Sequence, residues 1–221
     1  ILPESLPPSK RRPLDVKKIN PFTSVFKLKK YQSVFGLAIS LFLIYFAGQA
    51  VQTVWTFYTM SKFHWDADLV GYSLGFVGLL IALVQGGLIR IILPKLGQER
   101  SIWIGLIFYA TGLILFAFAT KGWMMFAFLI PYCLGGIAGP ALQGYMSTNV
   151  PDNEQGNLQG GLTGLMSLSA ILGPLAMTSS FHYFTTPNPW FQFPGAPFLI
   201  GAFCMLLSAV LAVRSFKRNT N

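Results

Sequence analysis

The side chains best placed to do chemistry in this sequence form a polar stripe inside an otherwise apolar run. The stripe consists of Tyr45, Gln49, Gln52, Thr53 and Thr56, at steps of four, three, one and three residues. On an α-helix this spacing places all five on one face. Amide and hydroxyl groups in hydrocarbon are costly unless they are bonded, so the face must meet other helices or water. Two interpretations stay open: a hydrogen-bonded seam between helices, or the wall of a substrate cavity.

Two later apolar runs carry polar and helix-bending residues in the same way. The first run holds Tyr132, Gly136, Pro140, Gln143 and Ser147, and the second holds Gln159, Thr163 and Ser167. No enzyme motif accompanies them, since the sequence has no phosphate-binding loop, no H-E-x-x-H and no C-x-x-C. We therefore expect no catalytic residue, no metal and no cofactor. A membrane-embedded enzyme would need a convergent acid, base or metal cluster.

Six apolar stretches are long enough to carry these residues through a bilayer, which takes about 20 residues per helix. They cover residues 34–57, 69–93, 102–119, 123–148, 156–184 and 197–213. Of the 221 residues 53% are hydrophobic and only 10% are charged, whereas a soluble domain carries roughly 25% charged residues. The runs are continuous rather than alternating, which argues against membrane strands. The predicted fold class is an all-α polytopic membrane protein with six transmembrane helices.

The basic residues give this arrangement an orientation. If six spans alternate and both ends are cytoplasmic, only Lys62 and Lys121 of the 16 lysines and arginines fall in outside loops. This is the positive-inside pattern, so the net charge of +9 reflects topology and we expect no nucleic-acid partner. We expect residues 1–33 to be a cytoplasmic linker, 34–213 the membrane domain and 214–221 a cytoplasmic tail. The chain opens on Ile1 rather than Met, and we expect a fragment.

The loop between the second and third spans resembles a known pattern. Residues 86–100 read GGLIRIILPKLGQER, which is similar to the short cytoplasmic loop between paired helices of the major facilitator superfamily. The positions that carry the likeness are Gly87, Arg90, Gly97 and Arg100. Gly97 allows a tight turn, and the basic residues suit the cytoplasmic face.

Further segments narrow the resemblance to the C-terminal half of the tetracycline/proton antiporter family. They are FHWDA at 63–67, FATKGW at 118–123, PALQ at 140–143, QGNLQG at 155–160 and LGPL at 172–175. The likeness covers nearly the whole chain. It implies helices seven to twelve of a twelve-helix transporter, arranged as two inverted three-helix repeats. It also makes Pro140, Gly173 and Pro174 the positions where helices kink or pack closely.

The resemblance implies a secondary transporter that exports a small amphipathic compound across the inner membrane of a bacterium by alternating access. Its expected partners are a small-molecule substrate, a proton, membrane lipids and the N-terminal six-helix half. On the residues and the resemblance together, we assign substrate binding to Gln49, Gln52, Thr56, Gln85 and Gln143.

Two positions depart from the family. Drug-exporting members carry a histidine in the second of these spans and an aspartate in the third, where this chain has Ile81 and Tyr109. A proton-carrying group would then lie in the N-terminal half, or the coupling differs. The alternative is a scaffold or assembly protein that keeps the fold without transporting anything.

Overall fold

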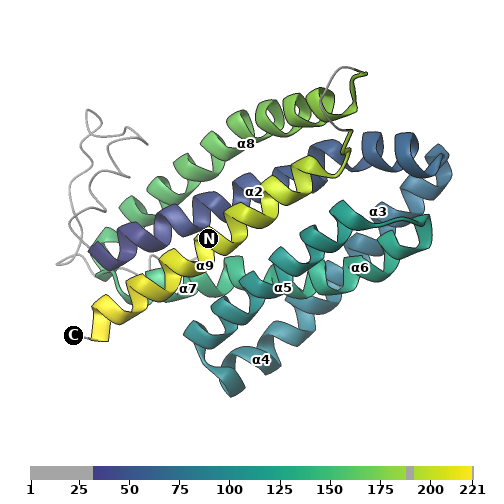
Figure 1. Cartoon of the computed structure of the whole chain (residues 1–221). Coiled ribbons are helices and arrows are strands. Elements are labelled where there is room, and N and C mark those ends of the chain that lie inside the picture. The colour runs from purple at the N-terminus through teal and green to yellow at the C-terminus, as the bar shows by residue number, and fades with distance from the viewer. Residues whose placement is uncertain (1–31, 188–191, 221) are drawn as a thin grey trace, which may run out of the picture.

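The protein is a bundle of long helices (Figure 1). The computed structural model describes residues 32–187 and 192–220. The helices are α2 (Gln32–Phe63), α3 (Ala67–Leu83), α4 (Ile89–Leu96), α5 (Gln98–Phe118), α6 (Gly122–Leu134), α7 (Ala138–Thr148), α8 (Gln155–Thr185) and α9 (Ala196–Thr220). Three short segments join or precede them: the π-helix η4 (Val84–Leu88) and the 3₁₀ turns η5 (Gly135–Ile137) and η6 (Asp152–Glu154). Nearly all of the predicted linker, residues 1–33, lies outside the described part.

Six helical units are long and apolar enough to cross a membrane, which confirms the predicted all-α fold. They are Val34–Phe63, Ala67–Leu96, Gln98–Phe118, Gly122–Thr148, Asp152–Thr185 and Ala196–Lys217. The described residues contain no strand. Most units run past the hydropathy boundaries, because helical hydrogen bonding continues through polar residues. The Thr59 hydroxyl, for example, does not interrupt α2, because it donates to the Trp55 carbonyl of the same helix at 2.9 Å. α9 extends through most of the predicted tail.

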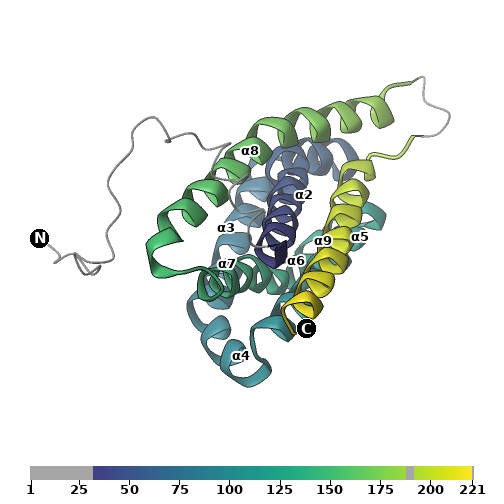
Figure 2. The ribbon, with the colours of Figure 1, turned by 90° about the vertical axis from the view of Figure 1, so that its left-hand side faces the viewer.

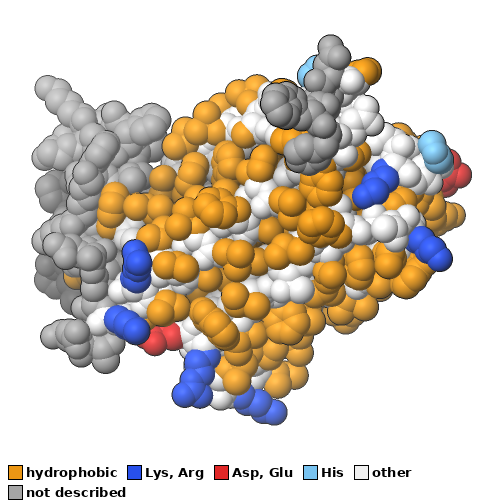
Figure 3. Space-filling view, in the orientation of Figure 1, with side chains coloured by type: hydrophobic (Ala, Val, Ile, Leu, Met, Phe, Trp, Pro, Cys, Tyr) orange, Lys and Arg blue, Asp and Glu red, His pale blue; other side chains and the backbone are white. Residues whose placement is uncertain are grey.

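Three helices form the centre of the bundle. α2, α5 and α9 pack side by side, α8 lies along α2, and α6 and α7 lie along α5 (Figures 1 and 2). The start of α2, the end of α9 and the α4–α5 turn lie at one end of the bundle (Figure 1). Charged side chains gather towards the two ends, with an apolar surface between them (Figure 3). This is the surface pattern that a bilayer requires.

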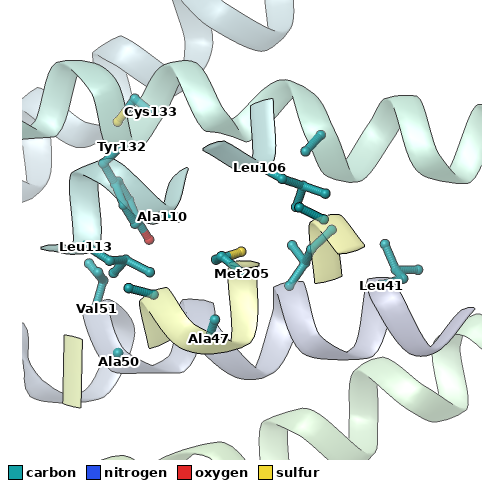
Figure 4. Close-up of a cluster of buried hydrophobic side chains, with 14 of the residues drawn as sticks. Leu41, Ala47, Ala50, Val51, Leu106, Ala110, Leu113, Tyr132, Cys133 and Met205 are labelled. Carbon is teal, nitrogen blue, oxygen red and sulfur yellow. The ribbon is translucent and has the colours of Figure 1, made fainter. Parts of the chain in front are cut away.

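Large apolar side chains from the central helices fill the core, and glycines let the backbones approach. Leu41 of α2, Leu113 of α5 and Met205 of α9 are fully buried in one cluster (Figure 4). A Cβ placed on Gly135 would lie 2.6 Å from the backbone nitrogen of Tyr109. Only a residue without a side chain lets α5 and η5 cross at that separation.

Single residues shape two of the turns, and the turn at Gly97 is the one that the sequence predicts. Asp66 caps α3, since its Oδ1 accepts a hydrogen bond from the Leu69 nitrogen at 2.8 Å. Gly97 separates α4 from α5 with a φ of 77°, a left-handed conformation that glycine adopts without strain. The Ser101 hydroxyl donates to the Gly97 carbonyl at 2.7 Å and braces this turn.

Candidate functional site

The polar stripe of α2 lies on the side of that helix that meets α7 and α8. Tyr45 and Thr56 are half-buried and Gln52 is exposed, whereas Gln49 is only 9% exposed. The Thr53 hydroxyl donates to the Gln49 carbonyl at 2.6 Å, so its proton is used within α2. The stripe therefore presents one buried amide, one exposed amide and two hydroxyls at different depths along a single helix.

A hydrogen bond joins α2 to α7 at the N-terminal end of this stripe. The Gln143 Nε2 donates to the Tyr45 Oη at 3.2 Å, and both side chains are half-buried. Two residues that lie far apart in the chain are thus brought together. Tyr45 belongs to the stripe that the sequence shows, but its pairing with Gln143 carries no local sequence signal.

Close packing joins α2 to α8 next to the buried amide. Gly173 lies directly against the side chain of Gln49, and any Cβ on Gly173 would collide with Gln49 Cγ. The ring of Pro174 follows immediately and removes the backbone N–H that the carbonyl of residue 170 would otherwise accept. Gly173 and Gln49 therefore fix how closely α8 approaches the stripe.

Gln85 lies where two irregular helical segments touch. It belongs to η4, which contacts η5, and its Nε2 would be 3.6 Å from a Cβ on Gly136. η5 sits one turn before Pro140, whose missing N–H leaves the Gly136 carbonyl without its helical donor. π segments inside helices frequently occur at functional sites.

The two positions that depart from the family occupy different surroundings. Tyr109 lies between α5 and α6, where its hydroxyl donates to that of Tyr132 at 3.4 Å and the rings meet edge to face at 4.7 Å. Ile81 is 37% exposed on α3. The structure therefore places a bonded phenol inside the bundle at one position and an apolar side chain on its surface at the other.

α8 presents a second polar row on its open side. Its members, at steps of four residues, are the exposed side chains of Gln159, Thr163 and Ser167. No hydrogen bond within the described chain involves their side chains. In hydrocarbon such a row is unfavourable, so it belongs against water or another protein surface.

Most of the loop motif lies at the end of the bundle that holds both described ends of the chain, although Gly87 shares η4 with Gln85. Gly87 and Arg90 are exposed on η4 and α4, and Arg100 is exposed on α5. Nearby, the Tyr145 hydroxyl donates to the Glu99 Oε1 at 3.1 Å and ties α7 to the start of α5. The motif thus shapes the α4–α5 turn rather than the polar stripe.

One bracing residue of this end was not among the predicted site residues. The Gln155 Nε2 donates to the Ser147 carbonyl at 2.7 Å and to the Val150 carbonyl at 2.9 Å, and its Oε1 accepts from the Ser147 hydroxyl at 2.9 Å. This amide closes the turn between α7 and α8. The sequence signal was a glutamine at the start of an apolar run, just after Pro151 and two acidic residues.

The chemistry available at the polar stripe is neutral hydrogen bonding. Amides both donate and accept, and hydroxyls do the same, so the site suits a ligand with hydrogen-bonding groups on an apolar body. In the part of the chain that the structure describes, no three His, Cys, Asp or Glu residues are grouped so that they could hold a metal ion.

Comparison with known proteins identifies the family of the chain. A family model described as the Major Facilitator Superfamily matches residues 1–174 and, in a second match, residues 37–220. Tetracycline resistance protein, class C, of Escherichia coli is 35% identical over 192 residues, covering 87% of this chain and 47% of its own length. The class D protein of Salmonella ordonez is 35% identical over 211 residues, covering 93% of this chain and 51% of its own length.

A more distant similarity extends beyond bacteria. The human Hippocampus abundant transcript-like protein 1 is 28% identical over 232 aligned residues, covering 96% of this chain and 46% of its own length. The chain spans about half the length of the curated relatives it matches.

Proposed function

The chain belongs to the Major Facilitator Superfamily, and from that premise we propose that it forms the C-terminal half of a transporter that exports a small amphipathic compound by alternating access. In this proposal the bundle rocks against an N-terminal six-helix half about a central cavity. The protein lies in the inner membrane of a bacterium, and the end that holds both described chain ends faces the cytoplasm. The relatives named tetracycline resistance proteins support export of a drug-like compound.

The observation that carries the proposal is a set of polar side chains on α2, α7 and η4 of an otherwise apolar bundle, of which Gln52 and Gln85 are exposed. Gln143 reaches Tyr45, while the amides of Gln49, Gln52 and Gln85 make no hydrogen bond within the described chain. An amide inside a membrane protein needs a partner. A water-filled cavity with a substrate supplies one, whereas a purely structural seam would have bonded these amides to one another.

The open polar row of α8 supports the N-terminal half as a partner. Gln159, Thr163 and Ser167 are exposed, and lipid would leave all three unsatisfied. A second six-helix bundle with a cavity between the two halves gives this row an aqueous or polar neighbour. Membrane lipids would cover the apolar remainder of the surface.

Proton coupling is part of the proposal, supported by the resemblance to tetracycline/proton antiporters. Tyr109 is held by Tyr132 and Ile81 carries no proton, so the proton-carrying group is assigned to the N-terminal half or to a different coupling route. A non-transporting scaffold is the second candidate, favoured by these same two residues. Efflux of a panel of fluorescent dyes, with and without a protonophore, separates the two: an exporter shows efflux that the protonophore abolishes.

The substitution Gln49→Ala tests the cavity assignment. It removes the buried amide next to Gly173, and we expect transport to fall about fivefold to tenfold, the effect of one or more lost hydrogen bonds, with membrane abundance unchanged. The measurement is dye efflux normalised to the amount of protein in the membrane. Gln192→Ala, at an exposed glutamine before α9, is the matched control. Unchanged transport in Gln49→Ala would show that this face does not line the cavity.

A further inference from the structure

We propose that Tyr45 and Gln143 form a ligand subsite that recognises an uncharged carboxamide. The inference rests on the proposed function and adds to it the chemical class of the group that this half binds. It arises from a hydrogen bond that leaves one donor and one acceptor of the pair unused.

The direction of the bond determines what remains available. Gln143 Nε2 donates to Tyr45 Oη at 3.2 Å, so the phenol oxygen acts as the acceptor. The phenolic proton of Tyr45 is then left to donate, and Gln143 Oε1 is left to accept. Within residues 32–187 and 192–220 neither has a hydrogen-bond partner. Both side chains are half-buried, so a ligand can reach them.

The pairs that hold the bundle together use their protons differently. Ser40 and Ser208 each donate to the other's carbonyl, at 3.0 Å in both directions. The Trp55 indole donates to the Ser73 hydroxyl at 2.9 Å, and that hydroxyl donates in turn to a backbone carbonyl. The Tyr58 hydroxyl donates to the Phe116 carbonyl at 2.7 Å. All of these groups are fully buried with their protons in use, unlike the Tyr45–Gln143 pair.

A carboxamide complements the two unused groups. Its carbonyl accepts the Tyr45 proton, and its N–H donates to Gln143 Oε1. A carboxylate would place a lone pair against Gln143 Oε1, and an ammonium group would place a proton against the Tyr45 proton. Each charged group therefore meets one favourable and one unfavourable contact, and would also lose its hydration on entering the bundle. The neutral amide makes two favourable contacts.

Binding of two fluorescent aromatic amides to the purified protein in detergent tests the subsite. Anthranilamide has a carboxamide with both a carbonyl and an N–H. Its N,N-dimethyl analogue keeps the carbonyl but has no amide N–H. We expect the wild-type protein to bind anthranilamide about fivefold more tightly than the analogue, as one neutral hydrogen bond allows. Gln143→Leu should weaken anthranilamide about fivefold and leave the analogue unchanged. Tyr45→Phe should weaken both amides, because both keep the carbonyl.

Tyr58→Phe is the matched control. It removes a tyrosine hydroxyl whose proton is already used within the core, and we expect it to leave the affinity for both amides unchanged. Equal weakening of both amides by Gln143→Leu, or no measurable binding of anthranilamide to the wild-type protein, would overturn the subsite. If dye efflux persists in that case, only the subsite is lost. If efflux is absent as well, the proposed function is lost with it.

Discussion

The helical units of this bundle fall into two groups that differ in how much of their apolar stretch is buried within the chain. Half or more of the most apolar stretch of α2, α5 and α9 is buried within the chain, at 56%, 50% and 50% of its residues, and the unit Gly122–Thr148, which contains α6 and α7, reaches 56%. In the unit Ala67–Leu96, which contains α3 and α4, the share is 6%, and in the α8 unit it is 28%. All of these units are apolar enough to cross a membrane, so hydropathy alone does not distinguish them.

The difference shows which helices hold the fold and which are available for other contacts. The centre is joined by bonded serines, such as Ser40 and Ser208, and by glycines placed against backbone, such as Gly112 and Gly135. α3 buries only Val70 and Ser73. Without a hydrophobic driving force between helices in lipid, close packing and hydrogen bonds carry helix association. α3 and α8 are therefore the surfaces available to lipid and to a partner bundle.

A large side chain placed on a glycine of each region gives the sharpest test of this contrast. Gly135→Leu would force η5 away from the Tyr109 backbone and should cost about 3 kcal/mol or more, as severe overpacking does. A Cβ on Gly75 of α3 meets no atom within 4 Å, so Gly75→Leu should change stability by no more than about 0.5 kcal/mol. Thermal unfolding in detergent, followed by size-exclusion chromatography, measures both. Equal losses would remove the distinction between centre and periphery.

The attachment of α3 to the centre should show an intermediate effect. Ser73→Ala leaves the buried Trp55 indole N–H without an acceptor, and an unsatisfied buried donor costs about 2 kcal/mol. The same unfolding assay measures the loss. Ser179→Ala, at an exposed serine of α8, should have little effect. If the two variants behave alike, the Trp55–Ser73 bond does not anchor α3.

Inside the centre, the serine pair should contribute the smallest measurable term. We expect Ser40→Ala and Ser208→Ala each to cost about 1 kcal/mol, with a coupling energy near 0.6 kcal/mol in a double-mutant cycle, the average for polar pairs between membrane helices. A coupling energy of zero would mean that the two hydroxyls act independently, and that packing alone holds α2 against α9.

Much of the fold could be predicted from local features of the sequence. Continuous apolar runs predict six spans and Gly97 predicts a turn, because each depends on chemistry within a few residues. The predicted positions of the helix ends were less accurate. The first predicted span ends at residue 57, where the apolar run ends, but α2 continues to Phe63. Polar side chains at a membrane surface do not interrupt a helix.

The candidate site was less accessible to sequence reasoning, because its important contacts join distant parts of the chain. The stripe through Gln49 and Gln52 follows from helical spacing, but its contact with Gly173 depends on how α8 packs. The pairing of Tyr45 with Gln143 depends on how α7 continues after η5. The π-helix η4 has no proline to signal it, since Pro94 lies beyond its end. The roles assigned to these residues in substrate binding stay predictions.

The wide turn at Val84–Leu88 also affects everything that follows it. A π turn takes up about one residue more than an α turn, so the side chains beyond it are offset by about 100° from the phase set in α3. Arg90 and the rest of α4 thus point in directions that the outer part of the same helix does not predict. Removing a single residue from this segment would restore a regular α-helix and redirect α4 and the α4–α5 turn, while leaving the composition almost unchanged.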